Sequence, residues 1–305
     1  MKVLVTGGAG FIGAVTVREL LKAGYDVVVF DNLICGHRET IPKNVKLVEA
    51  DLRIPSDIDN ALASEKFDAV LHFAAFTMVP ESMENPIKYF ENNVYASINL
   101  LNAMVKYKVK RIVFSSSAAV YGEPKELPVS ENAPTSPANT YGETKRTVEQ
   151  YLKWYEIAYG IKYISLRYFN AAGADLENDI GEDREIETHL IPLLIRSAMG
   201  IIESVPIFGS DYPTRDGTCI RDYIHVKDLA NAHVLSLNSL FRDGANSEIY
   251  NLGSEKGFSV REIVKAVENV TGHKPNTIDT LRRTGDPPAL VASSKKIRDK
   301  EPNTA

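Results

Sequence analysis

The amino-acid sequence predicts an α/β protein: a doubly wound parallel sheet with a smaller, interleaved α+β lobe. Two observations carry this prediction. In the first half, short apolar runs rich in β-branched residues alternate with helical stretches. A glycine-rich turn joins the first of these runs to the first helix. Buried strands separated by helices form a parallel sheet that is covered on both faces.

The predicted elements of the sheet follow one another from the N-terminus. Gly24 follows the predicted helix 11–22 and Gly160 follows the predicted helix 140–159, and glycine at such a position favours the end of a helix. The predicted strands are residues 3–6, 27–30, 46–48, 69–71, 112–114, 163–166 and 248–252, and the helices are 11–22, 86–108 and 140–159.

The alternation ends after Asn170. Residues 171–188 are rich in Gly, Asp and Glu and are predicted to form a loop, and residues 206–218 have the composition of turns. Helices are expected at 189–200 and 259–271. We therefore assign residues 1–170 plus about 221–252 to the sheet domain, and about 171–220 plus 253–305 to the smaller lobe.

Charge and cysteine content narrow the function classes. Of the 305 residues, 35 are basic and 40 acidic, for a net charge of −5, so we expect neither nucleic acid nor an anionic membrane as a partner. The two cysteines form no metal or disulfide motif, and no metal site is expected. No leader pattern and no apolar run of about 20 residues is present, so we expect a cytoplasmic protein.

The glycine-rich turn predicts a Rossmann-type dinucleotide site. Gly7, Gly10 and Gly13 lie between the first strand and the first helix, where backbone N–H groups can approach a pyrophosphate. Asp31 ends the second strand. A carboxylate there accepts hydrogen bonds from a ribose and repels a 2′-phosphate, which favours NAD over NADP. The alternative is a flexible turn with a capping aspartate.

Tyr141 and Lys145 form a candidate acid/base pair. They lie four residues apart at the start of a predicted helix, on one face. A phenol has a pKa of about 10, and a nearby ammonium and a nicotinamide cation would favour the phenolate. Tyr121 and Lys125 share the spacing, but Pro124 argues against a helix there. By itself such a pair is more often a solvated helix face.

Three serines, Ser115 to Ser117, follow the fifth predicted strand. The carboxyl ends of strands face the ligand crevice of an open α/β sheet. The Ser117 hydroxyl can therefore hydrogen-bond a substrate hydroxyl there. Ser115 and Ser116 fit better, on the residues alone, as a polar strand end.

Together these motifs resemble the extended short-chain dehydrogenase/reductase family, and later segments narrow the resemblance to its UDP-glucose 4-epimerase branch. The resemblance covers nearly the whole chain. The general motifs are 6–13, Asp31–Leu33, Asp51–Leu52, His72–Ala75, Ser117, Val120–Gly122 and Tyr141 with Lys145; the narrower ones are Arg167–Asn170, Glu187–Pro192, Ile207–Tyr212 and Arg221–Val226.

The resemblance implies tightly bound NAD, a UDP-sugar substrate and a specific set of site residues. Two guanidinium groups suit a diphosphate, which agrees with the implied substrate set. The implied cofactor residues are Gly7, Gly10, Phe11, Ile12, Gly13, Asp31, Asn32, Asp51, Leu52, Phe73, Ala74, Ala75, Asn92, Ser115, Tyr141, Lys145 and Tyr168; the substrate residues are Ser117, Tyr141, Phe169, Asn170, His189, Leu190, Phe208, Arg221, Arg283 and Asp286.

The implied reaction is 4-epimerisation of a UDP-hexose. Tyr141 takes the proton of the sugar 4-hydroxyl with Ser117 as hydrogen-bond partner, hydride passes to NAD⁺, the keto sugar rotates, and hydride returns to its other face. Ala118 and Ala119 stand where related dehydratases place acids, so chemistry at one carbon is favoured. The alternatives are an epimerase for another UDP-sugar, N-acetylated or uronic, and a cofactor-binding sensor without chemistry.

Three positions depart from the branch that the chain resembles. Thr77 replaces a common lysine near the cofactor ribose, which removes a charge. Leu290, at a position that lines the sugar pocket, is intermediate in size and leaves substrate breadth open. The polar residues 301–305 replace an apolar continuation, so we expect a frayed end and a shortened lobe.

The resemblance also implies a homodimer paired through helices 86–108 and 140–159.

Overall fold

The doubly wound parallel sheet is confirmed in the computed structural model, which describes residues 1–283 and 285–300; the expected frayed end lies outside them. Seven parallel strands have the order β10-β6-β5-β4-β1-β2-β3. Their bounds are β1 Lys2–Thr6, β2 Asp26–Asp31, β3 Lys46–Glu49, β4 Ala69–His72, β5 Arg111–Ser117, β6 Lys162–Tyr168 and β10 Glu248–Leu252.

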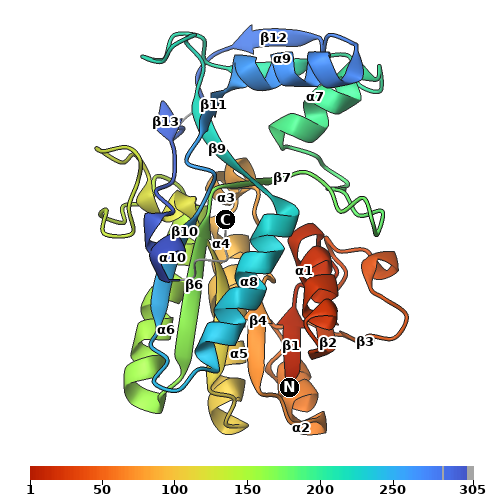
Figure 1. Cartoon of the computed structure of the whole chain (residues 1–305), viewed down its shortest axis with the longest axis vertical. Helices are drawn as coiled ribbons and strands as arrows, with labels where there is room; N and C mark the ends of the chain where they lie inside the picture. The colour runs from red at the N-terminus through yellow and green to blue at the C-terminus, as the bar shows by residue number, and fades with distance from the viewer. Residues whose placement is uncertain (284, 301–305) are drawn as a thin grey trace.

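Helices cover both faces of this sheet (Figure 1). One layer contains α1 (Phe11–Lys22) and α8 (Val226–Leu240); the other contains α2 (Pro55–Ser64), α5 (Ala96–Lys106) and α6 (Thr140–Tyr159). Side chains alternate between the two layers because successive residues of a strand face opposite ways. In β1, Val3 and Val5 belong to the apolar core with Leu20 of α1, whereas Leu4 belongs to the core with Leu100 of α5.

The predicted helix 86–108 is a run of three helical segments. It begins as α4 (Pro86–Tyr89), continues as a π-helix (Phe90–Tyr95) and ends as α5. The side chain of Asn93, in the π-helix, accepts from the Phe76 N–H at 2.8 Å and donates to the Phe76 carbonyl at 3.0 Å. The wide turn therefore coincides with the point where this helical run is fastened to the loop that follows β4, a setting typical of π segments near functional sites.

Segments of the second half that lie outside the large sheet form a smaller lobe, at the top of Figure 1. Its helices are α7 (Leu190–Ala198) and α9 (Val260–Thr271), close to the predicted ones, and α9 begins with a capping box of Ser259 and Glu262. Strand β9 (Ile220–His225) pairs with β7 (Asn170–Ala172), β11 (Gly257–Ser259) and β13 (Ala289–Leu290), and β8 (Val205–Phe208) pairs with β12 (Thr277–Thr280).

These lobe strands include segments that the sequence predicted as loop or turn, since 170–172 and 205–208 are strands. They are two to six residues long. Such short runs show little alternation, and their partners lie far away along the chain. Short helices Arg38–Thr40, Val79–Glu84 (α3), Ala118–Tyr121 and Lys295–Lys300 (α10) complete the described elements.

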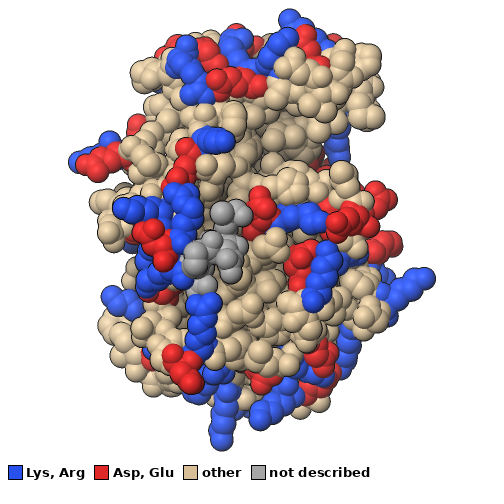
Figure 2. Space-filling model, viewed as in Figure 1, with Lys and Arg blue, Asp and Glu red and all other residues tan. Residues whose placement is uncertain are grey.

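The surface carries mixed charge. On the face shown in Figure 2, Lys and Arg side chains are interspersed with Asp and Glu, without one sign dominating. Among the residues that the structure describes, no helix is both long enough and apolar enough to span a bilayer.

Candidate active site

A large cavity lies at the carboxyl edge of the sheet and extends under the smaller lobe. Its volume is about 920 Å³, at the large end of the range for small-molecule sites. Every site residue predicted from the sequence lines it except Ser115 and Lys145. The strand ends contribute Asp31 from β2, Ser117 from β5 and Tyr168 from β6. The predicted cofactor and substrate groups are thus brought into one cavity.

The glycine turn can only be built from glycine at two of its positions. Gly7 has a φ of +73°, and a Cβ there would lie 2.5 Å from the backbone nitrogen of Ala74. A Cβ on Gly13 would lie 2.2 Å from the carbonyl oxygen of Gly7. The turn is therefore packed tightly between α1 and the loop after β4. It leaves an open floor at the N-terminus of α1 that fits a pyrophosphate.

Asp31 is buried at the end of β2 and braces the same turn. Its Oδ2 accepts from the Ala9 N–H and its Oδ1 from the Leu33 N–H, both at 2.9 Å. Burial raises the pKa of this carboxyl, and the two backbone donors oppose the shift. Next to it, Asn32 donates to Asp51, whose pKa is lowered to about 2 mainly by its hydrogen bonds with Arg53.

Tyr141 projects into the cavity from the first turn of α6. The helix begins at this point because the Asn139 side chain accepts from the Gly142 N–H at 2.8 Å. Burial raises the pKa of the Tyr141 phenol, and its hydrogen bond with Ser117 lowers it in part. The sequence predicted a lowered pKa for this phenol. Within the described structure the protein groups alone do not lower it, because the effect of desolvation is larger than that of the Ser117 hydrogen bond.

Lys145 lies one turn further along α6, behind the cavity wall. Its Nζ donates to the Ser115 carbonyl at 2.7 Å and lies 5.8 Å from the centroid of the Tyr141 ring. Burial lowers the pKa of Lys145 to about 7, and the Coulombic attraction of Glu149 opposes this. Ser115 is also behind the wall, where its Oγ is 3.3 Å from His233 Nε2. Both residues support the cavity without lining it.

A buried polar network lies beneath this pair, and the sequence did not reveal it. Arg167 of β6 binds Glu149 of α6 at both guanidinium positions, with Nε–Oε1 at 2.9 Å and Nη2–Oε2 at 2.6 Å. Ser116 donates to the same carboxylate at 2.6 Å, and Arg167 Nη1 donates to the Tyr121 hydroxyl at 2.9 Å. The only available signal was the spacing Tyr141, Lys145, Glu149 along one helix face.

Two guanidinium groups lie in the substrate half of the cavity. Arg221 of β9 donates to the Pro287 carbonyl at 2.8 Å and lies 3.5 Å from an oxygen of Asp286. Arg283 stacks on the ring of Phe208, 4.2 Å from its centroid. Asn170 donates to the Asp222 carbonyl at 2.8 Å. Phe169, His189, Leu190 and Leu290 line this half as well.

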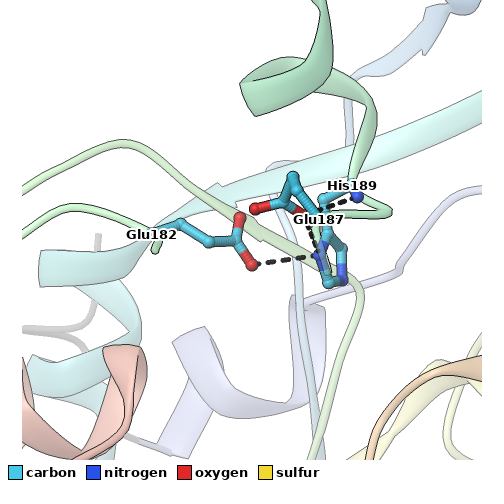
Figure 3. Close-up of side chains that lie close together, drawn as sticks. All are labelled: Glu182, Glu187 and His189. Atoms are coloured by element: carbon cyan, nitrogen blue, oxygen red, sulfur yellow. Dashed lines mark hydrogen bonds and ion pairs between the residues drawn. The ribbon is translucent and has the colours of Figure 1, made fainter. Parts of the chain in front are cut away.

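A cluster of Glu182, Glu187 and His189 fixes the segment that precedes α7 (Figure 3). His189 Nδ1 is 3.1 Å from Glu182 Oε1 and 3.0 Å from Glu187 Oε1. No metal site is expected from the sequence, whereas the ligand atoms of these three residues lie within 4.8 Å of one another and could hold an ion. Because the imidazole nitrogen already contacts both carboxylates, we interpret the cluster as a hydrogen-bonded network.

The sequence profile described as "NAD dependent epimerase/dehydratase family" matches residues 3–253. The chain belongs to this family. The chain is 48% identical to the UDP-glucose 4-epimerase of Lacticaseibacillus casei over 98% of its own length and 90% of that protein's.

Solved structures of other members of the NAD dependent epimerase/dehydratase family share the fold described above. A UDP-glucose 4-epimerase from Brucella ovis in complex with NAD is 43% identical, with a TM-score of 0.94 over 98% of this chain and 91% of that one. One from Bifidobacterium longum in complex with NAD⁺ and UDP is 41% identical, with a TM-score of 0.94 over 98% and 92%. The resemblance inferred from the motifs is confirmed at the level of the family and the fold.

Proposed function

We propose that this chain is an NAD-dependent UDP-hexose 4-epimerase that interconverts UDP-glucose and UDP-galactose. One observation carries the proposal: a glycine turn that fits a pyrophosphate, a tyrosine–serine pair and two guanidinium groups line one continuous cavity. The relatives named above as UDP-glucose 4-epimerases support the same activity. The cofactor is NAD.

The cofactor half of the cavity fits a dinucleotide. Gly7, Gly10, Phe11, Ile12 and Gly13 would receive the pyrophosphate at the start of α1. The predicted set Asp31, Asn32, Asp51, Leu52, Phe73, Ala74, Ala75, Asn92 and Tyr168 would hold the rest, with Ser115 and Lys145 acting from behind the wall. NAD⁺, when bound, supplies the acceptor and donor of one hydride at the sugar C4.

The chain's own residues move and hold the proton. The Tyr141 phenolate oxygen would take the proton of the sugar 4-hydroxyl and later return it. The Ser117 hydroxyl would hydrogen-bond the Tyr141 oxygen and the sugar 4-oxygen. Lys145 holds the Ser115 carbonyl and, when protonated, places a positive charge 5.8 Å from the centroid of the Tyr141 ring. Ala118 and Ala119 offer no acid, which limits proton transfer to one carbon.

Tight binding of the nucleotide and loose binding of the sugar suit this reaction. Arg221 and Arg283 would pair with the diphosphate, and Asn170, Phe208 and Asp286 would hold the nucleoside. Phe169, His189 and Leu190 would complete the substrate site. Leu290, between the sizes of a small residue and a tyrosine, would limit the sugar that fits.

We further propose residues 1–170 plus about 221–252 as the NAD-binding domain, the remainder as the UDP-sugar lobe, and the cytoplasm as the location.

The outer face of α6 supports a homodimer, because Trp154 and Ile157 are 62% and 65% exposed there. Sedimentation should give a dimer that Trp154→Glu converts to monomer. A wild-type monomer at micromolar concentration would rule this assembly out.

The direct test of the function is product analysis. Purified protein is incubated with UDP-galactose without added NAD, and UDP-glucose is measured by chromatography. We expect interconversion to an equilibrium mixture, with NAD recovered from the denatured protein. Failure to turn over UDP-galactose with NAD supplied, combined with turnover of an N-acetylated or uronic UDP-sugar, would replace the substrate and keep the chemistry. No turnover of any of them would refute the proposal.

A further inference from the structure

Arg184 places a positive charge in the cofactor half of the cavity. Its Nη1 donates to the hydroxyl of Thr77 at 3.1 Å, and Thr77 belongs to the loop that follows β4. Its Nε lies 3.2 Å from Glu182 Oε1. Arg184, Thr77 and Glu182 all line the cavity. A residue of the segment between β7 and α7 therefore reaches across the cavity mouth to the wall formed by the sheet domain.

The guanidinium is held in this position by the partly buried cluster of Glu182, Glu187 and His189. Glu182, which binds Arg184, also lies 3.1 Å from His189 Nδ1. His189 contacts Glu187, whose side chain is only 1% exposed and also accepts the backbone N–H groups of Thr188 and His189 at 2.8 Å (Figure 3). The cluster thus fixes the segment 182–189. Arg184 contacts the cluster through its Nε and reaches Thr77 with its Nη1.

Arg184 faces both the nucleoside side and the chemical side of the cofactor half. Its charge lowers the pKa of Cys35, which follows β2, and also lowers the pKa of Tyr141 and Tyr168, although burial outweighs this at all three. Within the described residues, its Nη2 makes no hydrogen bond or ion pair. Donors therefore remain for a ligand between these groups.

Two of the other three cavity arginines, Arg221 and Arg283, lie in the substrate half. Arg221 and Arg283 lie beside Asp286 and Phe208, and Arg196 lies 3.7 Å from Asp183. The glycine turn brings backbone donors but no cationic side chain, and Asp31 and Asp51 add negative charge nearby. Among the arginines that line the described cavity, Arg184 is the one that hydrogen-bonds the loop after β4, in the cofactor half.

We propose that Arg184 is a cofactor-binding residue whose guanidinium pairs with a phosphate oxygen of the dinucleotide, so that cofactor binding and docking of segment 181–189 stabilise each other. Arginine suits this role because its planar donors match a phosphate and keep their charge at any physiological pH. The inference rests on the proposed function for the identity of the cofactor. Its ligand class is the phosphate group of a dinucleotide, in distinction from the diphosphate of the UDP-sugar.

The test measures NAD binding directly. Full-length wild type, Arg184→Gln, Arg184→Lys and the control Arg261→Gln are stripped of NAD, and NAD and UDP affinities are measured separately by calorimetry. Arg261 is a fair control because it makes an exposed ion pair with Asp279 outside the cavity. Thermal unfolding of the stripped proteins shows whether each variant is folded.

We expect Arg184→Gln to weaken NAD binding about 10- to 100-fold, the loss typical of a charge-assisted contact, with UDP affinity unchanged. Arg184→Lys should retain part of the affinity, and Arg261→Gln all of it. Added salt should weaken NAD binding less in Arg184→Gln than in wild type. Equal NAD affinity of wild type and Arg184→Gln, or a loss confined to UDP, would overturn the inference. Wild type that does not bind NAD would overturn the proposed function as well.

Discussion

Replacing Tyr141 by phenylalanine should reduce turnover of UDP-galactose by about 10²- to 10⁴-fold, the usual contribution of a positioned acid/base group. The hydroxyl is the one atom removed, and it lies in the cavity with a hydrogen bond to Ser117. Loss of a hydroxyl that is desolvated in the described structure should not destabilise the fold. Product chromatography of the variant, with recovery of bound NAD, measures both effects.

Tyr155→Phe is the matched control for this experiment. Tyr155 lies on the same helix α6 as Tyr141 but outside the cavity, and its hydroxyl donates to Asn102 of α5 at 2.6 Å. Turnover of this variant should therefore stay at the wild-type level. If Tyr141→Phe also kept wild-type turnover while binding NAD, the proton would have to move through another group, and the assigned role of Tyr141 would be wrong.

Replacing Arg167 by methionine should destabilise the protein by about 3–5 kcal/mol, because it leaves the buried Glu149 carboxylate without its countercharge. Both side chains are almost fully buried, at 5% and 3% exposure. The Ser116 hydroxyl and the more distant Lys145 remain near Glu149, but neither replaces the two hydrogen bonds from the guanidinium. Urea unfolding at neutral pH, followed by circular dichroism, measures the change.

The double variant Arg167→Met/Glu149→Met separates charge from shape. Removing both partners leaves no unpaired charge, so it should be more stable than Arg167→Met alone. An exposed pair gives the reference: Arg261→Met should cost about 1 kcal/mol or less. A single Arg167 variant as stable as the Arg261 variant would show that the network beneath the site contributes little.

The features set by local rules were predictable from the sequence. Strand positions in the sheet domain follow from buried β-branched runs, and α6 spans Thr140–Tyr159 as predicted, with Gly160 in the left-handed conformation behind it. The glycine turn was predictable from its place between a strand and a helix, and the clash of a Gly13 Cβ with the Gly7 carbonyl is local to the turn, whereas the clash at Gly7 involves Ala74 of the loop after β4. Nearly all residues predicted for the site line one cavity, since carboxyl ends of parallel strands share an edge.

The tertiary structure decided what depends on residues far apart in the chain. The strands of the smaller lobe are too short to show a period, and they form because distant partners complete them. The contact between Arg184 and Thr77 joins residues 107 positions apart, and the Tyr121–Asn251 hydrogen bond joins residues 130 apart. The raised pKa of Tyr141 is likewise a result of burial. Desolvation and long-range pairing depend on which surfaces meet in the folded chain, so the local periodicity of the sequence does not predict them.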